Sequence, residues 1–244
     1  MPRSSATQDF ADRPPWTRPG FIASAALVLI VVIAGVVVAI ASDSDDRSTT
    51  GTPPPATPTP SQTTSPQDLP TAVPTTAPAG VRWELVGSLP VPVSTTAGPS
   101  RVNGTTASGF THTPDGALIA AAQVLMRSSL GREYWEPTIK GQFVPSQDRD
   151  RLLAQMSSVD TSDVDPGSLS QIAGYQYQSY TPDTAVIGLV LRAPSAGSPQ
   201  YHILSLTLLW RDGDWRMQAP PGGSWISVNR RTNDLAGVVE WGPR

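Results

Sequence analysis

A long uncharged run near the start of the chain limits what this region can become. No charged residue occurs between Arg18 and Asp43, and the apolar core of the run is Phe21–Ile40. As an α-helix rising about 1.5 Å per residue, this core spans about 30 Å, the thickness of the hydrocarbon layer of a bilayer. We therefore predict a transmembrane helix at 21–41, with the lipid bilayer as the partner of Phe21–Ile40.

The flanking charges predict the orientation of this helix. Three arginines precede the run, and only Arg47 follows it closely. The positive-inside rule then places residues 1–20 in the cytoplasm and the C-terminal part outside the plasma membrane. A cleaved signal peptide is the alternative, because Ala39-Ile40-Ala41 resembles a cleavage site. The apolar region of a signal peptide is usually about 7–15 residues long, so the longer run favours an uncleaved anchor.

The next segment, residues 42–80, has the composition of a disordered linker. Positions 43–80 hold nine prolines and ten threonines, with almost no large apolar side chain. Such a segment cannot bury enough apolar surface to offset its conformational entropy. We predict a spacer with extended polyproline II stretches, followed by one extracytoplasmic domain at 81–244. An O-glycosylated stalk and a tether of no particular length are alternatives.

The outer domain opens with a short strand expected at 83–86, and helix signals follow it. Thr113-Pro114-Asp115 is a start signal, with a capping threonine and a proline in the first turn. The following helix, 116–129, is apolar nearly all round, which predicts burial on several sides. We expect a helical or turn segment at 132–142, broken at Pro137, and a capped helix from 146 or 147 to 156. The stretch from 91 to 109 reads as irregular.

Strand signals follow the helices. After Gln171 the apolar residues alternate with a period of two, which predicts several strands. Asp212-Gly213 predicts a two-residue hairpin that places Trp210 opposite Trp215 and Leu208 opposite Met217 on the core side. Further strands are expected at 225–228 and at 235–241. Helices followed by an antiparallel meander predict an α+β fold, in which a curved antiparallel sheet wraps one buried helix.

Residues that carry chemistry are few. The chain has no cysteine, which excludes disulfides, thiolate metal sites and thiol nucleophiles. His112 and His202 are the only imidazoles; we expect His112 to bond loop backbone and His202 to lie on the solvent side of its strand. A hydrolase or isomerase that uses His112 with a nearby aspartate is the enzymatic alternative. The net charge of −3 gives no basic field for nucleic acid. We predict no catalytic residue, no metal site and no cofactor.

Aromatic residues are the remaining candidates for function. Most of them are expected in the core, but a curved sheet around a helix often leaves a pocket that aromatic rings line. The residues expected to line a pocket or an interaction surface are His112, Trp135, Tyr175, Tyr177, Trp210 and Trp215.

Three features together resemble a family of uncharacterised actinobacterial single-pass membrane proteins, many of them associated with integrative or conjugative elements. They are the anchor with its Pro/Thr-rich linker, the segment Gly109–Ala117 around the helix start, and the Trp-Arg-Asp-Gly-Asp-Trp-Arg hairpin. The helix-then-sheet order is also similar to the cone-shaped fold of nuclear transport factor two. Scaffold proteins of conjugative, type IV-like channels use that fold outside the membrane. The resemblance implies a cystatin-like or transport-factor-like cone and no catalytic residues.

These observations predict a non-enzymatic scaffold that is anchored in the membrane and docks to envelope proteins, as a component of a conjugative transfer apparatus. A homo-oligomer is expected as well. The alternative is a tethered domain that binds or senses a small ligand in an aromatic pocket, which requires a closed cavity with inward polar groups.

Overall fold

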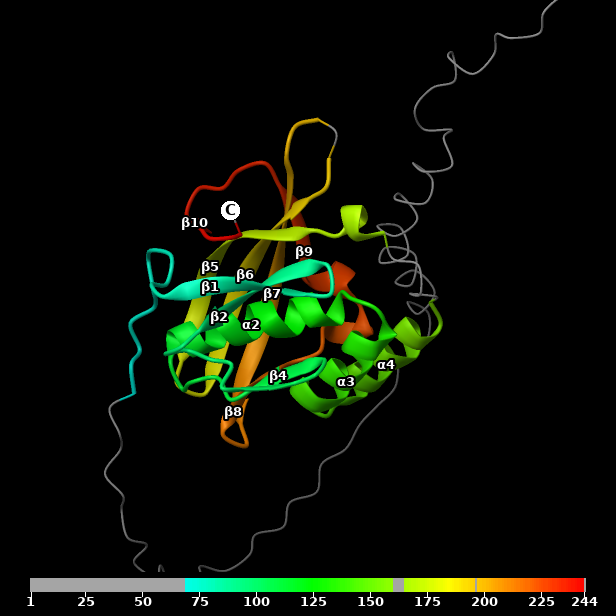
Figure 1. The fold of residues 1–244 in the computed structure, drawn as a ribbon, viewed down its shortest axis with the longest axis horizontal. Coiled ribbons are helices and arrows are strands. Elements are labelled where there is room, and N and C mark those ends of the chain that lie inside the picture. The colour runs from blue at the N-terminus through cyan, green and yellow to red at the C-terminus, as the bar shows by residue number, and fades with distance from the viewer. Residues whose placement is uncertain (1–68, 160–164, 196, 244) are drawn as a thin grey trace, which may run out of the picture.

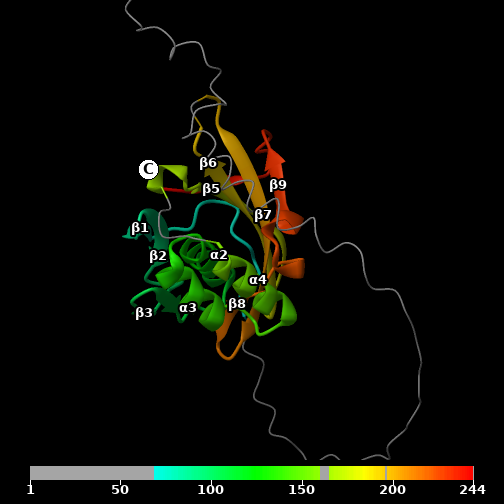
Figure 2. The ribbon, with the colours of Figure 1, turned by 90° about the vertical axis from the view of Figure 1, so that its right-hand side faces the viewer.

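The computed structural model describes residues 69–159, 165–195 and 197–243. The predicted cytoplasmic tail, the predicted membrane helix at 21–41 and most of the predicted linker lie outside these ranges. Within them, none of the helices combines the length and the apolar character that crossing a bilayer requires. Figures 1 and 2 show one helix, α2 (Pro114–Ser128), with two small hairpins on one side and a larger sheet on the other.

The two hairpins precede α2 in the chain. Strands β1 (Val81–Val86) and β2 (Leu89–Ser94) form the first, and β3 (Arg101–Asn103) and β4 (Thr106–Ser108) form the second. Both pairs are antiparallel. β2 is largely buried, whereas half of the residues of β1 are exposed. β2 therefore packs on the body of the domain and β1 lies on its outer side.

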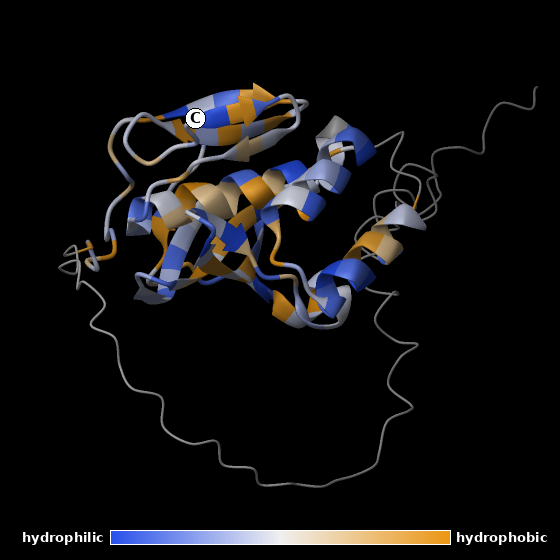
Figure 3. Cartoon of the chain, turned by 90° about the horizontal axis from the view of Figure 1, so that it is seen from below, coloured by the Kyte–Doolittle hydropathy of each residue, from blue (hydrophilic) through white to orange (hydrophobic). Residues whose placement is uncertain are grey.

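Helix α2 begins where the sequence predicts. Thr113 is its N-cap, and its hydroxyl accepts a hydrogen bond from the amide of Gly116 at 3.1 Å. All but one of the residues of α2 are buried, because strands cover it from both sides. Small alanine side chains permit this close approach, and Figure 3 shows tan and orange turns along the helix with blue ones between them.

Two shorter helices follow α2. The first, α3 (Arg132–Gln142), continues through Pro137 instead of breaking there, and the buried side chains of Trp135 and Ile139 hold it against the core on both sides of the proline. The second, α4 (Gln147–Ser157), is capped by Ser146, whose hydroxyl accepts from the amide of Arg149 at 3.1 Å. The predicted start of this helix is confirmed.

The main sheet is antiparallel, with strand order β10-β5-β6-β7-β8 and with β9 paired to β7. Its members are β5 (Gln171–Thr181), β6 (Thr184–Ala193), β7 (Gln200–Arg211), β8 (Asp214–Met217), β9 (Asn229–Thr232) and β10 (Val239–Glu240). The predicted hairpin register is confirmed, since Trp210 faces Trp215 and Leu208 faces Met217. Short 3-10 turns occur at η2 (Pro166–Ser168), η3 (Pro221–Gly223) and η4 (Trp225–Val228).

The predicted fold class is wrong. We expected an α+β cone of helices packed in one curved antiparallel sheet, with a membrane helix in front, but the described chain is mostly β-structure with three α-helices. The reason lies in the segment before α2, residues 91–109, where a glycine-rich run suggested irregular backbone. That segment forms β2, β3 and β4, so α2 is covered by hairpins on its second side. The strand expected at 225–228 is also wrong, because those residues form the 3-10 turn η4.

Candidate interaction surface

Five of the six predicted site residues belong to one chain of aromatic contacts. Neighbouring ring centroids in it are 3.9–6.2 Å apart. In spatial order the chain consists of Trp83, Trp241, Tyr175, Tyr177, Tyr180, Trp215, Trp210 and His112. The sixth predicted residue, Trp135, lies on α3, where it is buried with the guanidinium of Arg132 5.5 Å from its ring centroid.

His112 closes one end of this aromatic chain. Its ring stacks on that of Trp210, with centroids 3.9 Å apart and planes within 3° of parallel. Its Nε2 lies 2.6 Å from the carbonyl oxygen of Pro182. A carbonyl can only accept, so Nε2 carries a proton and donates it. The ring thus fastens the start of α2 to the β5–β6 turn, and the partner it bonds is a carbonyl rather than a carboxylate.

Asp214 links the helix-start segment to the Trp-Arg-Asp-Gly-Asp-Trp-Arg hairpin. Its buried carboxylate accepts from the amides of Gly109 at 2.9 Å, Phe110 at 3.0 Å and Trp215 at 3.0 Å. The indole Nε1 of Trp215 donates to the carbonyl of Thr111 at 2.9 Å. The two sequence segments therefore form one structural joint, which the sequence alone did not reveal.

Two tyrosines tie the sheet to neighbouring backbone. The hydroxyl of Tyr177 donates to the carbonyl of Pro114 at the start of α2, and that of Tyr175 donates to the carbonyl of Thr76 at 2.8 Å. Burial, assisted by the nearby Asp115 carboxylate, raises the pKa of Tyr175 to about 12 and moves the pKa of Tyr177 upward as well. Both phenols therefore stay protonated as donors near neutral pH. The end of the predicted linker lies against the domain at Tyr175.

The aromatic chain does not line either of the two clearest hollows of the described structure. One is an open depression on α3 beside Glu136, and the other, of about 190 Å³, lies beside the cis peptide of Gly98-Pro99. None of the eight aromatic residues borders them. Among the described residues, no group of three or more acidic, histidine or cysteine side chains could hold a metal ion. Five of the predicted site residues pack ring against ring, and several of them bond backbone carbonyls.

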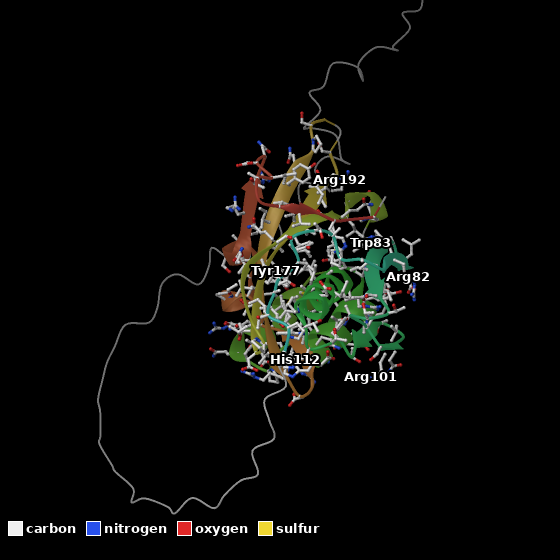
Figure 4. The ribbon with its side chains drawn as sticks, turned by 90° about the vertical axis from the view of Figure 1, so that its left-hand side faces the viewer. Arg82, Trp83, Arg101, His112, Tyr177 and Arg192 are labelled. Carbon is white, nitrogen blue, oxygen red and sulfur yellow. The ribbon has the colours of Figure 1, made fainter. Side chains whose placement is uncertain are left out.

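The exposed apolar residues point to a different region. Within the described ranges, the large apolar side chains that stand out in solvent are Leu85 on β1, 75% exposed, and Val102 on β3, 59% exposed. Both belong to the hairpins. Figure 4 shows Arg82 and Arg101 on the outer side of the hairpins and Trp83 closer to the centre. Isolated apolar residues at a surface are common and do not by themselves indicate an interaction site. A second feature beside them, such as unpaired backbone groups, is needed.

The backbone of β1 supplies that second feature. In the described part of the chain, β1 pairs with β2 alone, which leaves its other edge open. Pro90 and Pro92 of β2 lie opposite Leu85 and Trp83. Proline has no amide proton, so these positions suit pairs that do not exchange hydrogen bonds. The carbonyl of Pro92 confirms this geometry, because it turns away from β1 to accept from the side chain of Gln123 at 2.8 Å.

The two edges of this hairpin therefore differ. At the non-bonded pairs, the amides and carbonyls of Trp83 and Leu85 point to the open edge of β1. The outer edge of β2 lacks two amides, because Pro90 and Pro92 supply none. Such prolines are a common device that prevents edge-to-edge pairing. The chain blocks the edge of β2 and leaves the edge of β1 able to bond. Reasoning from the sequence missed this site, because the alternation of exposed Arg82 and Glu84 indicates a strand and not an unpaired edge.

The described residues form a β-rich domain in which β1 has one edge without a strand partner. The chain belongs to a family: its residues 44–240 match the family described as Domain of unknown function (DUF8175). The matched range covers all the described helices and strands and begins within the predicted linker. No curated protein matches the chain, and no solved structure matches it.

Proposed function

We propose that this protein is a non-enzymatic interaction protein, anchored in the plasma membrane, whose outer domain binds a protein partner in the cell envelope through β1. The observation that carries the proposal is the open edge of β1 beside the exposed Leu85. An exposed strand edge offers unpaired amides and carbonyls to an extended partner, and the adjacent side chains add specificity.

The remaining conspicuous residues support this reading by having structural tasks. His112 holds a turn, Asp214 holds the loop before α2, and Tyr177 holds the first turn of α2. None of these groups faces one of the two clearest hollows with a free reactive atom. The proposal for the domain therefore rests on its surface rather than on its aromatic interior.

The membrane anchor in the proposal rests on the sequence. The uncharged run Phe21–Ile40 and the arginines before it supply both the anchor and its orientation. The link to conjugation depended partly on the cone fold, which this domain does not have. The proposal therefore names envelope proteins as the partners, and genes for a transfer apparatus beside this one would extend it to conjugation.

Photo-cross-linking in intact cells tests the proposed function. A photoreactive amino acid replaces Leu85 in the full chain, and a matched control carries it at Arg230, which is exposed on β9 at the far side of the domain (Figure 2). We expect light-dependent products from position 85 and far fewer from position 230. Equal yields from both positions, or none from position 85, would contradict the proposal.

A further inference from the structure

We propose that the open edge of β1 pairs with β1 of a second copy of this chain, antiparallel and with the two-fold axis at Trp83. This inference rests on the proposed function, because it names a partner for the same edge. A two-fold contact must be complementary to itself, so each residue must tolerate the residue that the symmetry places opposite. The sequence of β1 can be tested against that condition residue by residue.

The backbone satisfies the condition. With the axis at Trp83, this residue faces its own copy, and Val81 faces Leu85 of the second copy. Because hydrogen-bonded pairs recur at every second position of an antiparallel ladder, these are the bonded pairs. Val81, Trp83 and Leu85 are the residues of β1 opposite Ser94, Pro92 and Pro90, and their amides and carbonyls point to the open edge. The groups that the new ladder needs are the ones that β2 leaves free.

The side chains satisfy the condition as well. The same axis places Arg82 of each copy directly opposite Glu84 of the other, in the closer, non-bonded type of pair. Both side chains are exposed, and within one chain they already form an ion pair at 2.7 Å. The axis also places Leu85 opposite Val81, which would cover the most exposed large apolar side chain of the described structure. Opposite charges and apolar pairs in these positions stabilise antiparallel strands.

Neighbouring registers fail the same test. An axis at Glu84 would place two glutamates directly opposite each other, and an axis at Arg82 would do the same with two arginines. Like charges directly opposite destabilise a strand pair. Among the registers centred on the middle of β1, only the axis at Trp83 combines open backbone groups with charge complementarity.

Charge reversal tests the pairing and its register together. In the full chain purified in detergent, Arg82→Glu places glutamates opposite glutamates, and Glu84→Arg places arginines opposite arginines. We expect each variant alone to dimerise about tenfold or more weakly than the unaltered chain, because each dimer contains two such contacts. A mixture of the two variants restores attraction at both contacts, so it should form mixed dimers. The ion pair within one chain cannot produce that rescue.

A second pair of variants tests the backbone. Leu85→Pro removes an amide that points to the open edge and leaves the bonds between β1 and β2 in place, whereas Leu85→Ala removes only the side chain. Sedimentation analysis should show a greater loss of dimer for the proline variant, with circular dichroism showing that both remain folded.

Three results would overturn the pairing: a monomeric unaltered chain at all concentrations, no mixed dimers from the two charge variants, or equal dimerisation of the proline and alanine variants. If cross-linking at position 85 nevertheless captured other envelope proteins, the proposed function would stand without the self-pairing. Absence of every product at position 85 would remove the proposed function itself.

Discussion

The joint between the β7–β8 hairpin and the loop before α2 makes a strong prediction about Asp214. Its carboxylate receives three backbone amides, from Gly109, Phe110 and Trp215, at 2.9–3.0 Å, and the residue is 5% exposed. Asp214→Ala removes the acceptor for all three. Two of the amides belong to residues about a hundred positions earlier in the chain, so the substitution detaches a long-range contact.

The magnitude follows from the number and the burial of these bonds. A hydrogen bond to a charged group contributes about 1.5–3 kcal/mol, and a buried donor left without a partner costs about 1–3 kcal/mol. The three bonds share one carboxylate, so their effects do not add fully. We expect Asp214→Ala to lower the free energy of unfolding by about 3–5 kcal/mol, and Asp214→Asn, which keeps one acceptor oxygen, by about 1–3 kcal/mol.

Urea unfolding of the full chain, followed by tryptophan fluorescence and circular dichroism, measures this loss. Asp183→Ala is the matched control, because Asp183 lies in the other tight turn of the sheet and its side chain is exposed. The control should change the free energy of unfolding by no more than about 0.5 kcal/mol. A loss below about 1 kcal/mol for Asp214→Ala would refute the reasoning that this carboxylate holds the two segments together.

Three further predictions concern the start of α2 and its neighbours. Gly116→Ala should destabilise the chain by about 2 kcal/mol or more, because the added methyl group would lie 2.0 Å from the carbonyl oxygen of Thr111. This loss would occur although alanine favours helices. Gly141→Ala is the control in the same urea assay: the glycine lies in open space on α3, so alanine should stabilise the chain by about 0.5–1 kcal/mol. Burial raises the pKa of Tyr175 from 10.0 to about 12, so the stability that its protonated phenol supplies is lost as the pH rises from 10 to about 12. Over this range the urea midpoint of the Tyr175→Phe variant should fall less than that of the unaltered chain. Burial raises the pKa of the Asp115 carboxyl above its usual value of 3.8. The unaltered chain should therefore lose stability relative to Asp115→Asn as the pH rises from 3.8 through the raised pKa of the folded state. An identical pH dependence of the two proteins would contradict this.

Local signals made parts of the fold predictable. The caps at Thr113 and Ser146 and the Asp212-Gly213 turn act within a few residues, so sequence alone was enough to place two helix starts and the register of one hairpin. At 225–228, three apolar residues suggested a strand, but that segment forms a 3-10 turn instead. Periodicity over four residues is too short to separate these two structures.

Long-range contacts were not predictable. The segment from 91 to 109 was expected to be irregular, but its first residues belong to β2, where the fit of alternating prolines to a strand depends on the bonding pattern of the partner strand. Three of the residues expected to line a pocket or an interaction surface, His112, Trp210 and Trp215, do meet ring to ring. Their role in holding backbone depends on Asp214 and Pro182, whose partners lie far away in the sequence. The edge of β1 is open because no second strand of the described chain pairs with it. The local sequence of β1 does not indicate whether such a strand exists.

Hydrogen exchange at the amides of β1 tests most directly whether this edge is where the protein meets its partner. The amides of Arg82 and Glu84 face β2 and should be protected at every concentration. The amides of Trp83 and Leu85 face outward, and within the described part of the chain they have no backbone partner. We predict that these two amides exchange slowly in the concentrated full chain and faster on dilution or in the Arg82→Glu variant. The account would be contradicted if both amides exchanged as fast as those of an exposed loop at every protein concentration, in cells as well as in detergent.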